Sequence, residues 1–292
     1  MSAAHPIVAV TGSSGAGTSS TRPLFARLFD RLGLRAAFVE GDSFHAFDRE
    51  QMDAALHRAR VRGENFSHFG PAANDWDRLE ELFREYAETG RGSTRRYLHT
   101  DSEAAEVGQA AGTFTRWTAL PADTDLLFYE GLHGAVVTEE HDIASHVDLL
   151  IGVTPTVNLE WIQKIHRDTH ERGYNPDEVT RTILRRMPDY VRYMAPQFSR
   201  TDVNFQRVPL VDTSNPFQPA NVPGPGESLL VIHLNDKGRI PAEFDELLAD
   251  LPGAFLSRAD TLVVPGERMA TAMELILTPA LTSLIRNRQR HP

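Results

Sequence analysis

The sequence predicts an α/β domain in which helices flank a mostly parallel β-sheet, followed by a C-terminal extension. Two observations carry this prediction: short apolar runs alternate with helical patterns, and a glycine-rich loop directly follows the first apolar run. The chain has 292 residues, 41% of them hydrophobic, which is enough to bury one large core. We expect residues 1–214 to form the main domain, including a helical lid at about 156–194, and residues 215–292 to pack on it as the extension.

The elements follow in order along the chain. Apolar runs bounded by polar or turn residues predict buried strands at 7–10, 36–40, 126–129 and 149–153. Apolar residues at helical spacing predict helices at 20–32, 49–60, 76–88 and 157–171. Asn175 before Pro-Asp-Glu is typical of a helix N-terminus, so another helix begins there and runs towards Met194. A proline- and glycine-rich linker is predicted at 215–226, and an amphipathic C-terminal helix at 266–286.

The composition excludes several classes of partner. The net charge of -10 argues against non-specific binding to nucleic acid or an anionic membrane, so neither partner is expected. The N-terminal segment lacks the features of a signal peptide, and no apolar run approaches the roughly 20 residues of a membrane span, so we expect a cytoplasmic location. The absence of cysteine excludes disulfides and thiolate metal sites. An anionic ligand needs a local cationic patch, and one lies between Lys164 and Arg186.

The glycine-rich loop predicts a site for nucleotide phosphates, because it lies between a strand and a helix. The candidate ATP-binding residues are Gly12, Ser13, Ser14, Gly15, Ala16, Gly17, Thr18, Ser19 and Ser20. The loop matches the P-loop pattern of kinase-like NTPases, except that Thr18 replaces the lysine that contacts the β- and γ-phosphates. Ser19 is a candidate Mg²⁺ ligand. The alternative is a glycine-rich turn that binds nothing.

Two acids after predicted strands extend this candidate site. Glu130 follows the run at 126–129, where an acid can bind Mg²⁺ beside the loop. Asp42 follows the strand at 36–40, at the edge where open α/β sheets bind ligands, and is the candidate general base and a candidate metal ligand. His45 and Arg49 follow it and can hold an anionic substrate. Taken singly, Glu130 is also explained as a solvated turn residue, and Asp42 as a turn former or helix cap.

Longer blocks of the sequence resemble the bacterial class (class I) of phosphoribulokinases. The resemblance runs from the loop, which carries the family's own threonine in place of lysine, to Pro265. The most specific blocks are FYEGLHGAVV at 128–137, NLEWIQKIHRD at 158–168 and PQFSRTDVNFQRVPLVDTSNPF at 196–217. The resemblance implies a P-loop kinase that uses Mg²⁺ and transfers the γ-phosphoryl group of ATP to the 1-hydroxyl of ribulose 5-phosphate, a step of the Calvin cycle.

The resemblance also implies roles for single residues. It makes Asp42 the general base, Glu130 the metal-binding carboxylate, and Lys164 and Arg167 catalytic cations of a lid over the phosphates. The residues that it places around the substrate are His45, Arg49, Tyr97, His99, Asp168, Arg172, Arg185 and Arg186. The residue spacing agrees, because the charged residues at 164, 167, 168 and 172 share one side of the predicted helix. The alternative is a solvated charged face.

Departures from the family pattern leave other functions open. Ala46 and Asp53 stand where the family usually carries basic residues, which affects the choice or affinity of the substrate. Bacterial members are commonly NADH-responsive oligomers, so we expect a homo-oligomer, and Arg31 and Arg258 are either effector-binding or ordinary surface residues. The alternatives are a uridine-kinase-like or other small-molecule P-loop kinase, and a catalytically impaired nucleotide-binding regulator.

Overall fold

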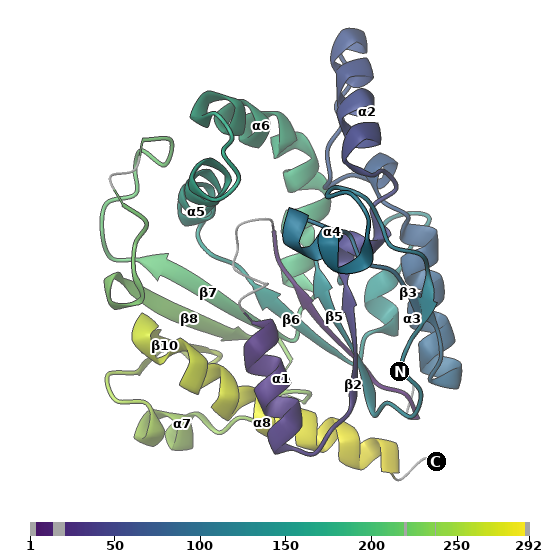
Figure 1. Cartoon of the computed structure of the whole chain (residues 1–292). Helices are drawn as coiled ribbons and strands as arrows, with labels where there is room; N and C mark the ends of the chain where they lie inside the picture. Colours follow the sequence, from purple (N-terminus) through teal and green to yellow (C-terminus); the bar gives the residue numbers. More distant parts are fainter. Residues whose placement is uncertain (1–3, 14–20, 219–220, 237, 290–292) are drawn as a thin grey trace.

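A single eight-stranded sheet runs through the centre of the computed structural model, which describes residues 4–13, 21–218, 221–236 and 238–289. Helices cover both faces of the sheet (Figure 1). The strand order is β2-β5-β1-β6-β7-β8-β10-β9. The strands are β1 (Ile7–Thr11), β2 (Ala36–Glu40), β5 (Leu126–Gly131), β6 (Leu149–Val153), β7 (Val203–Pro209), β8 (Ser228–Leu234), β9 (Phe255–Arg258) and β10 (Thr261–Pro265). A separate two-stranded sheet pairs β3 (Ser93–Thr94) with β4 (Thr118–Ala119).

The first five strands of the sheet, from β2 to β7, are parallel. Every residue of β1 and β6 is buried, as expected for parallel strands covered by helices on both faces. Glu130 of β5 lies opposite Val10 of β1 on one side and Glu40 of β2 on the other. The carboxyl ends of these three strands therefore meet at one edge. All four predicted strands and the mostly parallel sheet are confirmed.

The remaining strands add an antiparallel half that the sequence analysis did not identify. β8 pairs with β7 over the whole stretch from Val203 opposite Leu234 to Pro209 opposite Ser228, and β10 and β9 follow. The predicted linker at 215–226 falls in the connection between β7 and β8. Strands after residue 214 thus complete the same sheet, while the division into a kinase domain and an extension stays a prediction.

The predicted helices are confirmed, with α4 and α7 in addition. The helices are α1 (Arg22–Arg31), α2 (Arg49–Arg62), α3 (Trp76–Thr89), α4 (Asp101–Val107), α5 (Val157–His170), α6 (Pro176–Asp189), α7 (Phe244–Asp250) and α8 (Met269–Gln289). Phe25 of α1 and Ile276 of α8 belong to one apolar core, and Trp76 and Phe83 of α3 to a second one. Within the described ranges, no helix is both long and apolar enough to cross a membrane.

Helices α5 and α6 form a pair with its own small core of Ile165, Val179 and Ile183. The side chain of Asn175 accepts a hydrogen bond from the N–H of Asp177 at 2.9 Å, so the predicted helix cap is confirmed. After α6 the chain continues as a π-helical turn over Tyr190–Met194. Figure 1 shows the pair at the same end of the molecule as α2 and α4.

Candidate active site

The candidate active site begins where β1 and β5 end. The N–H of Gly12 donates to the carbonyl of Gly131 at 3.2 Å, which holds the start of the phosphate loop against β5, and Ser13 is buried. Ser14, Gly15, Ala16, Gly17, Thr18, Ser19 and Ser20 lie outside the described residues. Their part in ATP and metal binding stays a prediction.

A single 3₁₀ turn over Gly41–Phe44 continues β2 and carries Asp42 to the same edge. Residue 41 must be glycine, because a Cβ there would lie 2.6 Å from the hydroxyl of Tyr129 and 2.8 Å from the Cα of Gly131. Phe44 is buried in the core beneath α3 and anchors the other end of the turn. The turn is therefore fixed at both ends, while the Asp42 side chain remains 36% exposed.

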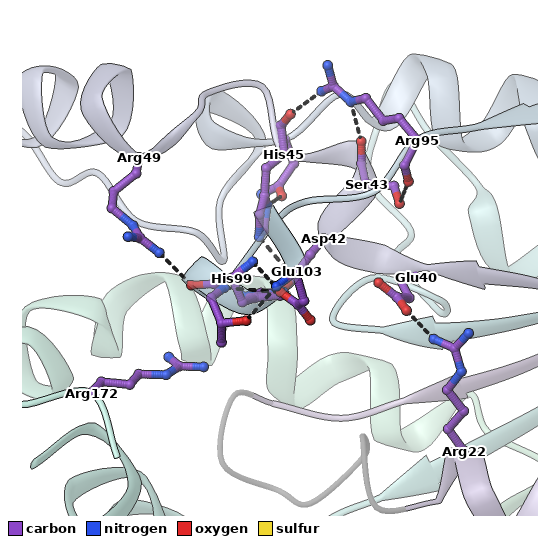
Figure 2. Close-up of polar contacts among 12 residues, drawn as sticks. Arg22, Glu40, Asp42, Ser43, His45, Arg49, Arg95, His99, Glu103 and Arg172 are labelled. Atoms are coloured by element: carbon purple, nitrogen blue, oxygen red, sulfur yellow. Dashed lines mark hydrogen bonds and ion pairs between the residues drawn. The ribbon is translucent and has the colours of Figure 1, made fainter. Parts of the chain in front are cut away.

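Two imidazole rings flank the carboxylate of Asp42 (Figure 2). The Nε2 atom of His45 lies 3.1 Å from Oδ1, and that of His99 lies 3.2 Å from Oδ2. Partial burial raises the pKa of Asp42, but charge and hydrogen bonds from His45 and His99 outweigh it and hold the pKa well below its usual value. Asp42 in turn raises the pKa of His45, against the effect of burial. Asp42 is thus ionised at neutral pH.

The other residues predicted near the sugar lie around Asp42 and its two histidines. Arg49 donates from Nη2 to the carbonyl of His99 at 2.9 Å. The ring of Tyr97 packs edge-on against His99, with centroids 4.8 Å apart, and lies 6.4 Å from the ring of His45. Burial raises the pKa of Tyr97, so its hydroxyl keeps its proton. The structure thus places polar side chains from separate segments around one carboxylate.

A second cluster surrounds Asp168 in the helix pair. Lys164 bonds Oδ2 of Asp168, while Arg167 and Arg172 approach Oδ1 at 3.0 and 3.4 Å. Lys164 and Asp168 are only 7% and 5% exposed, so these two residues are not part of a solvated charged face. Burial, followed by repulsion from Arg186, lowers the pKa of Lys164 to about 8. The pKa of Asp168 is lowered, because Lys164 and Arg167 outweigh its burial.

Two arginines of α6 add to this positive charge. Arg186 lies 5.7 Å from the ring centroid of Phe69, and burial together with Arg185 lowers its pKa to about 10. Among the described residues, its Nε has no hydrogen-bond partner. Burial also lowers the pKa of the half-buried Arg185. A partly buried guanidinium whose buried Nε is free to donate suits an anionic ligand, so the negative net charge does not extend to this part of the molecule.

Glu130 and Asp42 are two described carboxylates at this edge that suit a magnesium ion. Glu130 is partly buried at the end of β5, beside the strand that leads into the phosphate loop. Mg²⁺ bound with a nucleotide commonly takes one or two carboxylates together with phosphate oxygens. In the part of the chain that the structure describes, no three His, Asp or Glu side chains group into a metal site of their own.

Several polar residues of the site were not predicted from the sequence. Nδ1 of His45 lies 2.8 Å from the amide oxygen of Asn74, and Arg95 bonds the backbone of the Asp42 turn. The ring of His68 lies 4.9 Å from that of His45. Glu160 is buried one helical turn before Lys164, accepts a hydrogen bond from the hydroxyl of Tyr190 at 3.2 Å, and has its pKa raised by burial to about 7.

Only one of these residues carried a local signal. Glu160 precedes Lys164 and Asp168 by four and eight positions, so the helical spacing that grouped the charged residues also includes it. Asn74, His68 and Arg95 reach the site through tertiary folding, and their neighbours in sequence form no recognisable pattern.

Comparisons with known proteins agree over nearly the whole chain. The Phosphoribulokinase / Uridine kinase family profile matches residues 7–214. The plasmid phosphoribulokinase of Cupriavidus necator is 56% identical over 292 residues, and a probable phosphoribulokinase of Escherichia coli is 54% identical over 289; each alignment covers 99% of both chains. The solved structure of phosphoribulokinase from Rhodobacter spheroides superposes with a TM-score of 0.90 at 48% identity, covering 99% of this chain and 100% of the other.

The resemblance to bacterial phosphoribulokinases and the P-loop kinase fold are confirmed by these comparisons. The site described above lies within the matched residues 7–214. The chain therefore belongs to the Phosphoribulokinase / Uridine kinase family.

Proposed function

We propose that the chain transfers the γ-phosphoryl group of ATP to the 1-hydroxyl of ribulose 5-phosphate and forms ribulose 1,5-bisphosphate, a reaction of the Calvin cycle. The observation that carries this proposal is similarity along the whole chain, at 56% and 54% identity, to proteins named phosphoribulokinase and probable phosphoribulokinase. The site agrees, because an ionised carboxylate lies beside the start of a phosphate loop, and the charge of Arg186 acts on the pKa of its partner His45.

Asp42 is the general base of this reaction. Its two oxygens are oriented by His45 and His99, and its low pKa keeps it ionised, so it can accept a hydrogen bond from the attacking hydroxyl. In a loose phosphoryl-transfer transition state the attacking hydroxyl loses its proton late, so the base acts mainly by orienting that hydroxyl. His45, Arg49, Tyr97 and His99 bind the sugar phosphate around it.

Lys164 and Arg167 supply the positive charge that the loop lacks, since Thr18 replaces the usual lysine. Both side chains already contact Asp168, which holds them in a defined arrangement on α5. Fixed cations of this kind stabilise the charge on a transferring phosphoryl group without reorganising during the reaction. The residues that support them at the phosphates are Asp168, Arg172, Arg185 and Arg186.

Mg²⁺ accompanies ATP in this proposal, with Ser19, Glu130 and Asp42 as its protein ligands. Bound there, the ion would offset the negative charge of the phosphates. We further propose a cytoplasmic homo-oligomer, for which NADH is one candidate effector. Arg31 is available to such an effector only in part, because it already bonds Glu274 at 3.3 Å and Thr278 at 3.0 Å, both in α8. Arg258 lies on the exposed strand β9.

An acceptor screen tests the proposed function. Purified protein with MgATP is offered ribulose 5-phosphate, other pentose phosphates, uridine and pantothenate, and the rate of ADP formation is measured for each. We expect the highest kcat/KM with ribulose 5-phosphate and a product with a second phosphate at carbon 1. Preference for uridine would favour the uridine-kinase-like alternative. ATP binding without turnover on any acceptor would favour the regulator.

A further inference from the structure

Arg95 holds the backbone of the turn that carries Asp42. Its Nε donates to the carbonyl of Ser43 at 2.8 Å, and its Nη2 donates to the carbonyl of His45 at 2.8 Å. In return, the hydroxyl of Ser43 donates to the carbonyl of Arg95. Figure 2 shows the guanidinium at the backbone of the turn, apart from the side chains gathered around Asp42. The turn is thus clamped from a segment about 50 residues further along the chain.

Two aromatic rings fix the plane of this guanidinium. Its central carbon lies 3.6 Å from the ring centroid of Phe114 and 4.9 Å from that of Trp117. The planar fork of arginine can stack on a ring and donate to two acceptors at once, whereas the ammonium group of lysine has neither the plane nor the spacing. The two carbonyls are therefore held in a geometry that only arginine provides.

The hydrogen bonds of Arg95 affect Asp42 and His45 because both acceptor carbonyls lie in the segment 43–45, which joins these two residues. Ser43 directly follows Asp42, and the other carbonyl belongs to His45, whose ring faces the Asp42 carboxylate at 3.1 Å. A displacement of the turn would move the base and its imidazole partner together. When an enzyme holds two substrates and a base in a reactive geometry, a misplacement of about 1 Å can cost on the order of a hundredfold in rate.

We infer that Arg95 is a positioning residue for phosphoryl transfer, which acts by fixing the backbone of the Asp42 turn from behind. The inference rests on the proposed role of Asp42 as base. It assigns Arg95 no contact with either substrate, so its loss changes turnover and leaves nucleotide binding in place.

Arg95→Met tests this, with Arg78→Met as a matched control. The guanidinium of Arg78 also lies over Trp117, at 4.5 Å, but it pairs with the partly buried Asp75 at 3.8 Å, and among the described residues no hydrogen bond joins its side chain to the turn. We expect Arg95→Met to lower kcat on the order of a hundredfold, with ATP affinity within about twofold of the parent. Arg78→Met should change neither by more than about twofold. Near-parental kcat in Arg95→Met would overturn the inference.

A double-mutant cycle with Asp42→Asn separates positioning from general damage. If Arg95 acts through Asp42, Arg95→Met should slow the Asp42→Asn enzyme by no more than about threefold. An equal loss in both backgrounds would overturn the inference. Should Arg95→Met fail to fold, Arg95→Lys replaces it. We expect Arg95→Lys to fold with the Tm of the parent protein and to lose at least about tenfold in kcat. An unchanged kcat in that variant would contradict the positioning role of Arg95.

The cycle uses whichever acceptor the parent enzyme phosphorylates best. If the unsubstituted enzyme prefers another acceptor, the proposed substrate is refuted, but the double-mutant cycle still tests the role of Arg95. A parent that phosphorylates ribulose 5-phosphate while Arg95→Met remains fully active refutes the positioning role alone.

Discussion

The charge of Lys164 should set the alkaline limit of the enzyme. Its side chain is buried, and burial together with repulsion from Arg186 lowers its pKa to about 8, despite the carboxylate of Asp168. A lowered pKa means that the ammonium loses its proton as the pH rises through about 8, where an ordinary lysine would stay charged. Lys164, which we propose replaces the missing loop lysine, therefore loses its positive charge near pH 8, where enzyme kinetics can still be measured.

The size of the effect follows from that pKa. One pH unit above it, about one tenth of the molecules keep the charge, so kcat/KM for ATP should fall about tenfold for each unit above pH 8. Arginine stays charged throughout this range, so Lys164→Arg should lack this decline. Lys164→Ala should lose on the order of a hundredfold in kcat at pH 7, as expected when a charge that stabilises the transition state is removed.

The assay is kcat/KM for ATP between pH 6 and pH 10, because this ratio reports the ionisation of the free enzyme. A parent profile that is flat to pH 10, or one that declines equally in Lys164→Arg, would refute the assignment of the alkaline limb to Lys164. An alanine variant with near-normal kcat and weaker ATP binding alone would move Lys164 from catalysis to nucleotide docking.

Two further substitutions test the electrostatics of the site. Burial raises the pKa of Glu160 from 4.5 to about 7, which means that the folded protein disfavours the ionised carboxylate. The free energy of unfolding is therefore highest below about pH 4.5, and it falls as the pH rises through 7. Glu160→Gln stays neutral, so its free energy of unfolding should gain on the order of 3 kcal/mol over the parent between pH 5 and pH 8, and a pH-independent difference in Tm would contradict this. Asp53 is exposed on α2, one helical turn after Arg49. Asp53→Lys should lower KM for the sugar phosphate roughly two- to tenfold, and an unchanged KM would show that Asp53 lies away from the substrate.

The parallel half of the sheet was predictable because its strands are buried on both faces and read as short continuous apolar runs. The antiparallel half gave a weaker signal. In β8, from Ser228 to Leu234, fully and partly buried residues alternate, and β9 is exposed throughout. Strands of this kind depend on their neighbours for burial, and the sequence of one strand does not identify its neighbours.

Some features of the candidate site were also predictable from the sequence, and others were not. Asp42 and His45 lie within one turn of each other, so their proximity could be predicted from the sequence alone. His99 entered only through the family resemblance. The charged side of α5 was predicted by helical spacing, but its burial was not, because burial of Lys164 depends on α6 packing against it.

The turnover of Asp42→Asn with ribulose 5-phosphate and MgATP, measured together with ATP affinity, tests the central claim most directly. Asparagine preserves the size and one acceptor oxygen but cannot take the proton, so kcat should fall by roughly two to four orders of magnitude. ATP affinity should stay near that of the parent, because the phosphate loop is a separate element. Loss of ATP affinity in step with activity would leave Asp42 the role of metal ligand, beside Ser19 and Glu130, and remove its role as base. A kcat within about tenfold of that of the parent enzyme would contradict the account, because loss of a positioned base lowers the rate by roughly a hundredfold or more.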